Sequence, residues 1–389
     1  MTGALSMKRA APSTIGTVPG VLLLAVAALG LFGPVARNAP DLSLLSAGSA
    51  LLPVALLAAL ALLFVRRPAA DAAAVVLALG SALLAVLAQH TQSGTAALGG
   101  WGYWFTLAGS LLAAAYVTGR LTLAQGSDEE GASTSGIQRI LPAAVVPFLL
   151  LLTWEGLVVG NRVPTGIFPR VSDIGSALAA SWRVLLADAY LTFVKEVLFG
   201  FSFGLASGFL AGTAIAFSSF LKRGFLPLAT AFGAVPIVGL APVLGRALGV
   251  NWESKAAVVI IVTFFPVVLN VVQGLTSVDP LRLELLRSYG ARPLDVFFKL
   301  RLPNALPYLF NALKVAVVLA VVSVIVAEFL IPGPPNGLGQ RISLSAHRGA
   351  FDIVFAAILV SSVISMLLYW GVTMLERVFT SWHPSARGR

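Results

Sequence analysis

Long apolar runs separated by short polar segments constrain this chain more than any other feature of its sequence. A membrane-spanning helix needs about twenty predominantly apolar residues. With 58% hydrophobic and 11% charged residues, the chain is far from soluble proteins, in which about a quarter of the residues are charged. We therefore predict an all-α polytopic membrane protein with about ten transmembrane helices. The expected spans lie near residues 15–36, 44–65, 70–90, 101–121, 139–160, 188–216, 224–246, 255–275, 307–331 and 350–375.

The distribution of Lys and Arg predicts the orientation of these spans. If the amino terminus is cytoplasmic, the inner loops hold about twice as many basic residues as the outer loops, which agrees with the positive-inside rule. Both termini are then expected in the cytoplasm. The net charge of +10 reflects this anchoring and not nucleic-acid binding, since the basic residues lie at the ends of apolar runs and not on one aromatic-interleaved face.

A polar, acidic stretch rich in Gly and Ser divides the chain. Residues 125–138 show no apolar periodicity and are predicted to form a flexible linker. Before them, residues 1–124 hold four spans with little polar chemistry, which we interpret as an accessory bundle. After them, residues 139–382 hold six spans, and residues 383–389 form a short cytoplasmic tail.

A few polar and aromatic residues stand out in the N-terminal part. An interfacial aromatic belt explains Trp101, Tyr103 and Trp104 better than a ligand cage does. His90 is interpreted as a residue at the level of the lipid headgroups, in preference to a metal ligand.

Residues 276–305 form the most highly charged loop between two apolar runs. Its charged side chains include Arg282, Glu284, Arg287, Arg292, Asp295, Lys299 and Arg301. The loop could simply anchor the ends of its spans at the interface, or it could present a docking surface to a partner in the aqueous phase. The orientation derived above places this loop in the cytoplasm.

The local chemistry of the loop predicts a short helix, a turn and a second short helix. Asp279 is suited to cap the first helix, and Pro280 to its first position, where no amide donor is needed. Gly290 stands where the chain leaves the helix in a left-handed conformation. Pro303 is expected to end the second helix before the next span begins.

The order of residues in this loop resembles the cytoplasmic "EAA" loop of permease subunits of bacterial ATP-binding-cassette (ABC) importers. The residues at the pattern positions are Glu284, Gly290, Leu300, Leu302 and Pro303. Leu285 and Leu286 replace the two alanines that are usual in the family, and this departure enlarges the apolar surface of the docking helix.

Other segments resemble the nitrate, sulfonate and taurine branch of these permeases, which also includes permeases for pyrimidine precursors and riboflavin. They are Phe264-Phe265-Pro266 through Asn270, Gly274 through Pro280, Ala327-Glu328 and Gly337-Leu338-Gly339. The likeness covers roughly residues 139–382 and does not extend to the first 120 or so.

The resemblance implies a type I ABC importer permease core of about six helices in a bacterial cytoplasmic membrane. It implies as partners two ABC ATPase subunits, a second permease copy and a periplasmic or lipid-anchored binding protein. The transported solute would be a sulfonate, taurine or nitrate-like anion, or a vitamin precursor such as a hydroxymethylpyrimidine or riboflavin. The residues expected to couple to the ATPase are Glu284, Leu285, Arg287, Ser288, Gly290, Leu300, Leu302 and Pro303.

Polar residues within apolar runs are candidates for the translocation pathway. A carboxylate at the centre of a membrane helix costs about 2.5–3.5 kcal/mol on insertion scales, so Glu328 is expected to face a cavity or gate, unless it lies at the interface. The resembling permeases carry a Glu there too. Lys195 and Glu196 could form a charge pair or extend toward the surface. Glu196 departs from the family, which suggests a role in selecting the charge of the substrate.

Two further features of the eighth span are candidates for the pathway. Asn270 and Gln273 share one helical face and could form interhelical hydrogen bonds or line the pathway. Pro266, like Pro236 and Pro242 in the seventh span, is expected to open backbone carbonyls and bend its helix, as in helices that line the routes of transporters.

The sequence gives no candidate for a catalytic or metal site. There is no cysteine, and the three histidines lie far apart in sequence, so no cofactor or metal is expected. The chain contains no Gly-x-x-x-x-Gly-Lys-Ser/Thr loop, so ATP hydrolysis must belong to another polypeptide. The alternative function is a secondary transporter, or a membrane scaffold not coupled to an ATPase.

Overall fold

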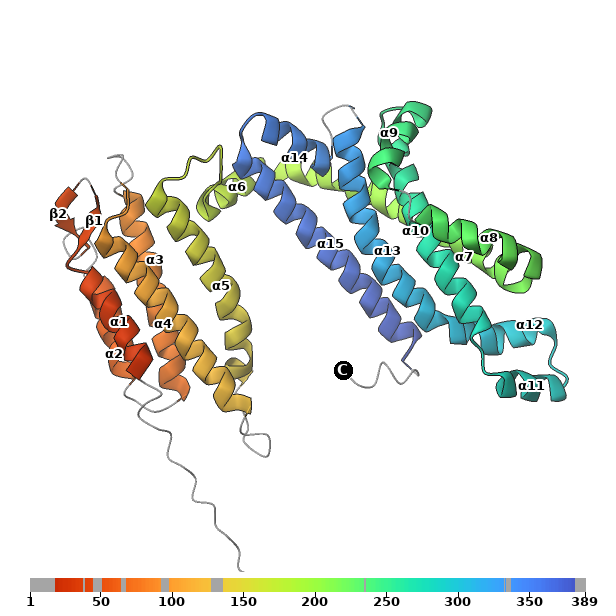
Figure 1. Ribbon diagram of the computed structural model, residues 1–389, viewed down its shortest axis with the longest axis horizontal. Coiled ribbons are helices and arrows are strands. Elements are labelled where there is room, and N and C mark those ends of the chain that lie inside the picture. The colour runs from red at the N-terminus through yellow and green to blue at the C-terminus, as the bar shows by residue number, and fades with distance from the viewer. Residues whose placement is uncertain are drawn as a thin grey trace, which may run out of the picture. The chain divides into compact units, whose positions relative to one another are not determined.

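The computed structural model describes residues 18–37, 39–44, 51–63, 68–91, 98–126, 136–233, 236–331, 333 and 337–381. This part of the chain is almost entirely helical and divides into two compact units, Met1–Asp173 and Ile174–Arg389 (Figure 1). Most of the predicted linker and all of the predicted tail lie outside the described residues.

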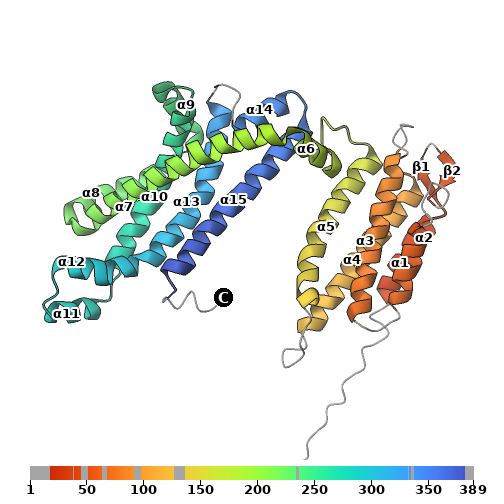
Figure 2. The ribbon, with the colours of Figure 1, turned by 180° about the vertical axis from the view of Figure 1, so that it is seen from behind.

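In its described residues, the first unit is a bundle of five helices that lie side by side in both views (Figures 1 and 2). They are α1 (Val18–Gly30), α2 (Leu51–Leu62), α3 (Pro68–Thr91), α4 (Trp101–Gly126) and α5 (Gly136–Asn161). Helix α5, predicted as the first span of the core, packs against α3 and α4. Their approach is close: a Cβ atom at Gly160 would lie 2.5 Å from the ring of Tyr103. The boundary at residue 139 stays a prediction.

A short β-hairpin, which the all-helical prediction did not include, follows α1. Strands β1 (Pro34–Ala36) and β2 (Ala39–Ser43) pair antiparallel, with Pro34 opposite Ser43 and Ala36 opposite Ala39. Gly33, Pro34 and Pro40 are poor helix formers. For that reason the first helix does not continue to residue 36.

Tyr103 lies in the core of this bundle, and its assignment to an interfacial belt was wrong. Its side chain is 0% exposed, and its hydroxyl donates a hydrogen bond of 2.7 Å to the carbonyl oxygen of Gly156. Trp101, two residues earlier on the helix, is 50% exposed. Since residues two apart on a helix point in different directions, only part of the aromatic cluster can face the bilayer.

A continuous helix of 47 residues leads into the second unit. It consists of α6 (Val171–Ala189), the π-helical segment η3 (Tyr190–Leu198) and α7 (Phe199–Phe217). Helix α10 (Trp252–Thr276) packs between α7 and α13 (Leu302–Leu330), and α13 also contacts α15 (Phe351–Phe379). Short helices lie at both ends of these long helices (Figure 1).

Four glycines, spaced four residues apart, form the contact of α7 with α10. Gly200, Gly204, Gly208 and Gly212 are all buried. A Cβ atom at Gly204 would lie 2.7 Å from the carbonyl oxygen of Ile260 on α10. Small residues at this spacing let helix backbones approach closely, so the two helices are held together along most of their contact.

The seventh predicted span is not one helix. The chain forms α8 (Ser219–Gly233) and α9 (Ile237–Leu248), with Pro236 between them in an extended conformation. A proline lacks the amide proton that a continuous helix needs. The bend expected at Pro236 is therefore a complete break, whereas Pro242 and Pro266 stay inside helices.

The remaining short helices lie at opposite ends of the second unit (Figure 1). At one end are α11 (Pro280–Ser288), α12 (Pro293–Val296) and the π-helical segment η4 (Phe297–Arg301). At the other end, with α9, is α14 (Leu338–His347). The loop of residues 276–305 and the loop after α13 thus belong to different ends.

Six helices among the described residues are long and apolar enough to cross a membrane. They are Ala69–Thr91, Ala143–Asn161, Val171–Phe217, Trp252–Thr276, Pro293–Leu330 and Phe351–Phe379. The first, second and seventh expected spans correspond to shorter apolar helices, Val18–Gly30, Leu51–Leu62 and Val238–Leu248. A multi-pass membrane protein is confirmed, and the count of ten stays a prediction.

Candidate functional site

The charged loop at residues 276–305 begins with the helix that the sequence predicted. Asp279 caps α11, because its carboxylate accepts a hydrogen bond of 2.9 Å from the amide of Leu281. Pro280 occupies the first turn. Gly290 has a φ of +74°, the left-handed conformation that favours glycine at a helix end. These three local predictions are confirmed.

The base of the loop is fastened to the end of α10. Arg301 donates a hydrogen bond of 3.1 Å from Nη1 to the carbonyl oxygen of Leu275, and Asn304 donates one of 2.9 Å from Nδ2 to that of Gly274. The last carbonyls of a helix lack intrahelical partners, and these side chains supply them. The guanidinium of Arg301 also lies 5.2 Å from the ring centre of Phe217 at the end of α7.

The prediction that Pro303 ends the second helix was wrong, because α12, η4 and α13 form one continuous helix from Pro293 to Leu330. In the π-helical segment the amide of Leu302 bonds to the carbonyl oxygen of Phe297, five residues back. Such a wide turn just before the proline accommodates the loss of one amide donor. Leu300, Leu302 and Pro303 are therefore part of a rigid helix that enters the membrane.

The first helix of the loop buries none of its side chains among the described residues. Leu281 is 74% exposed, Leu285 57% and the following Tyr289 82%. The side chains of Glu284, Arg287 and Ser288 are exposed as well. A helix that exposes large apolar side chains among charged ones is suited to contact another protein.

The two carboxylates predicted in the pathway come together at the other end of the unit. Glu328 on α13 accepts a hydrogen bond of 2.7 Å from Thr192 on η3, and others from the amides of Gly339 and Gln340 at the start of α14. Glu196, one turn from Thr192, lies beside Glu328. Both carboxyl groups are buried. Their assignment to the pathway stays a prediction.

Besides Glu328, a second carboxylate binds α14, and the sequence did not single it out. Asp188 on α6 accepts a hydrogen bond of 3.1 Å from the amide of Gly337, and its other oxygen accepts one of 2.8 Å from Nε of Arg341. Asp188 is buried. A carboxylate within an apolar run was the available signal.

The other candidates lie apart from this cluster. Lys195 is exposed whereas Glu196 is buried, so they do not pair, in agreement with their adjacent positions on a helix. Asn270 donates 2.9 Å to the carbonyl oxygen of Pro266 in its own helix, and not to another helix as one interpretation required. Gln273, on the same helix, is exposed.

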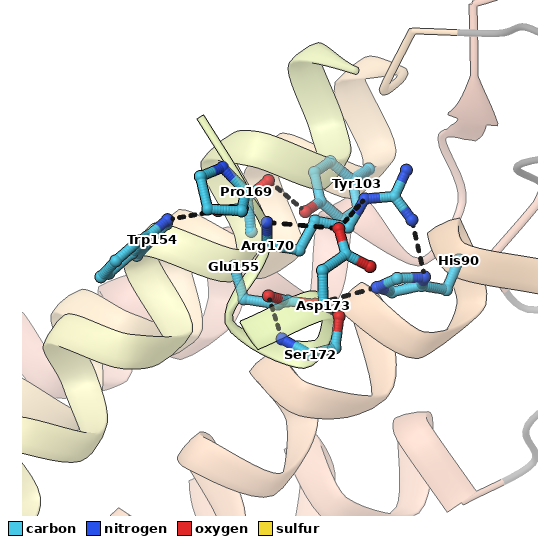
Figure 3. Close-up of polar contacts among 9 residues, drawn as sticks. His90, Tyr103, Trp154, Glu155, Pro169, Arg170, Ser172 and Asp173 are labelled. Carbon is cyan, nitrogen blue, oxygen red and sulfur yellow. Dashed lines mark hydrogen bonds and ion pairs between the residues drawn. The ribbon is translucent and has the colours of Figure 1, made fainter. Parts of the chain in front are cut away.

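A third polar cluster lies in the first unit, where the chain runs from α5 into α6 (Figure 3). His90 at the end of α3 contacts Glu155 on α5, with Nε2 2.9 Å from Oε1, and the hydroxyl of Ser172 donates 2.7 Å to the same oxygen. Arg170 reaches Nδ1 of His90 at 3.4 Å. Because Arg can only donate, Nδ1 accepts and Nε2 donates to Glu155. His90 is thus tied to Glu155 and Arg170, and its place at the level of the lipid headgroups stays a prediction.

No group of three or more His, Cys, Asp or Glu side chains that could hold a metal ion occurs within the described ranges.

Comparison with known proteins identifies the family. The sequence model described as "Binding-protein-dependent transport system inner membrane component" matches residues 204–380. A formylaminopyrimidine transport permease protein, ThiX of Halalkalibacterium halodurans, is 31% identical over 246 residues, which cover 60% of this chain and 92% of ThiX. The chain belongs to this family of ABC transporter permeases. A probable ABC transporter permease protein of Haemophilus influenzae is 29% identical over 244 residues, which cover 62% of this chain and 97% of that protein.

Other relatives place the permease in the predicted branch. The riboflavin transport system permease protein RibX of Chloroflexus aurantiacus is 29% identical over 250 residues, 63% of this chain and 92% of RibX. Permeases named for taurine, aliphatic sulfonates and nitrate match as well. The permease is therefore a transport subunit, and ATP hydrolysis in such systems belongs to separate subunits.

Proposed function

We propose that this permease is the membrane subunit of an ATP-driven, binding-protein-dependent importer of a small organic solute, and that α11 docks on a partner ATPase. The observation that carries the proposal is the exposed helix α11 with its fastened base. Its apolar side chains, Leu281 and Leu285, would bind in a partner groove, while Glu284 and Arg287 would orient it.

The contacts around the loop provide a route for force. Arg301 and Asn304 tie the base of the loop to the last carbonyls of α10. The glycine contact joins α10 to α7 in turn. A displacement of α11 by the ATPase would thus move α13, α10 and α7 together and open the core to the other side of the membrane.

The proposed assembly is a pair of permease copies with two ATPase subunits and one binding protein outside the membrane. Both termini and the 276–305 loop would be cytoplasmic. Residues 139–382 would form the type I transport core, and residues 1–124 an accessory bundle. The loops that would meet the binding protein include residues 161–183 and 332–348. Helices α6 and α14 occupy much of these two segments.

The substrate class follows from the relatives. Permeases related to this one are named for riboflavin, formylaminopyrimidine and taurine transport. We therefore propose either a small sulfonate, taurine or nitrate-like anion, or a vitamin precursor of the pyrimidine or flavin type. Binding-protein affinity for members of these two classes would identify the solute.

The test of coupling is a charge reversal on α11 with a matched control. In proteoliposomes with the cognate ATPase and binding protein, Glu284→Lys should insert normally. Because a lost charge pair at an interface costs at least about 2 kcal/mol, permease-stimulated ATP hydrolysis and uptake should fall by at least about tenfold. Glu253→Lys, an exposed glutamate at the other end of α10, should keep both.

Normal ATP hydrolysis and uptake in Glu284→Lys would contradict the docking role of α11. Uptake that needs no ATPase at all would instead favour a secondary transporter, and membrane insertion without any uptake a scaffold.

A further inference from the structure

The buried end of the second unit carries more acid than base. Among the residues that the structure describes, three carboxyl groups lie there, those of Asp188, Glu196 and Glu328, with two cations, Lys255 on α10 and Arg341 on α14. Arg341 pairs with Asp188 at 2.8 Å. Two carboxyl groups and one ammonium remain, so this buried cluster holds one negative charge too many if every carboxyl group is ionised.

The two glutamates differ sharply in the donors that surround them. Glu328, 1% exposed, accepts hydrogen bonds on both oxygens, from Thr192 on one and from the amides of Gly339 and Gln340 on the other. A carboxylate that accepts several hydrogen bonds at the start of a helix is stabilised in its ionised form. Glu328 is therefore the group of the pair that is built to carry the charge.

Glu196 has the opposite environment. It is 0% exposed, and neither of its carboxyl oxygens has a hydrogen-bond partner among the described residues. The charged groups close enough to interact electrostatically with Glu196 are Glu328 and Lys255. Lys255 directs a hydrogen bond of 3.0 Å from Nζ to the carbonyl oxygen of Val250. Two ionised carboxylates side by side in a buried site repel strongly, so one of such a pair keeps its proton.

We propose that Glu196 and Glu328 form a proton-binding site, in which Glu196 is the neutral acid and donates its hydroxyl proton to the ionised Glu328. The assignment gives Glu196 the partner that it otherwise lacks. It also balances the cluster, with Arg341 against Asp188 and Lys255 against Glu328. A neutral Glu196 cannot select substrates by charge, so this role replaces the one that the sequence suggested.

The site would join three elements through one proton. Glu196 lies on η3, Glu328 on α13, and the amides that bind Glu328 on α14. Removal of the proton would leave two buried negative charges between α13 and η3, and would weaken the attachment of α14. The inference is independent of the proposed ATPase contact, which lies at the other end of the unit.

The direct test is difference infrared spectroscopy on the purified, full-length permease in detergent at neutral pH. Protonated and ionised carboxyl groups have separate C=O stretching bands. We expect a protonated-carboxyl band that Glu196→Gln removes, with a loss equal to one carboxyl group per chain. Glu253→Gln, an exposed glutamate at the start of α10, should leave the band unchanged.

A second measurement uses proton linkage. The folded permease would hold one proton that an unfolded glutamate, with a pKa of about 4.3, has released. For one such proton, the equilibrium constant for unfolding should therefore rise about tenfold for each pH unit between about pH 6 and pH 8. In Glu196→Gln, whose amide can donate to Glu328 in place of the acid, the slope should be smaller by one proton.

Two results would overturn the proposal. One is a wild-type spectrum with no protonated-carboxyl band at neutral pH, which needs no variant to fold. The other is a band and a pH slope that stay unchanged in a folded Glu196→Gln permease, since the proton would then lie elsewhere.

Discussion

The glycine contact between α7 and α10 makes a quantitative prediction. A Cβ atom at Gly204 would lie 2.7 Å from the carbonyl oxygen of Ile260 and 2.7 Å from Cβ of Thr263. Backbone atoms cannot rotate away, so Gly204→Ala must push the helices apart. Overpacking of this kind costs about 1–3 kcal/mol, against a gain of about 1 kcal/mol from the better helix propensity of alanine. The net effect is a loss of up to about 2 kcal/mol.

The matched control is Gly224→Ala in α8, where a Cβ atom would have no neighbour within 4 Å. This change should keep the gain of about 1 kcal/mol. The two variants should therefore differ in free energy of unfolding by about 1–3 kcal/mol. Thermal unfolding of the purified permease in detergent measures the difference. If Gly204→Ala is as stable as Gly224→Ala, the close contact is not what holds these helices together.

Two further predictions concern topology and the N-terminal unit. Because the chain has no cysteine, single cysteines report cleanly: in intact cells Ser172→Cys should react with an impermeant thiol reagent and Ser288→Cys should not, and labelling of Ser288→Cys from outside would invert the proposed orientation. A chain that begins at Gly136 should still insert and bind the ATPase, but with a lower melting temperature than the full chain, since α5 loses its contacts with α3 and α4. Failure to bind the ATPase would show that residues 1–124 are more than accessory.

Features set by neighbouring residues were predictable from the sequence. The cap at Asp279 and the left-handed turn at Gly290 depend on only a few residues each, and both are as predicted. The continuous helix through Pro303 was not predictable in the same way, because it depends on a π turn that starts six residues earlier. The break at Pro236 was foreseen as a bend but not as two helices.

Long-range packing accounts for the rest of what the sequence did not reveal. Glu196 and Glu328 are far apart in the sequence, and nothing in either segment says that they meet. Tyr103 is buried because it contacts Gly156 on α5, a helix that was predicted to belong to the core of residues 139–382. The glycine spacing on α7 was visible in the sequence, but its partner surface on α10 was not.

The packing of α5 has a consequence for the order in which the permease folds during synthesis. The two helices against which α5 packs, α3 and α4, precede it in the chain. The start of α6, whose Ser172 binds Glu155, lies within this unit as well, so the unit has all its elements once Asp173 has been made. Ribosomes add about 5–20 residues per second, and residues 174–389 then require roughly 10–40 s more. We expect the first unit to be folded in the membrane during that interval, before synthesis of the second unit is complete.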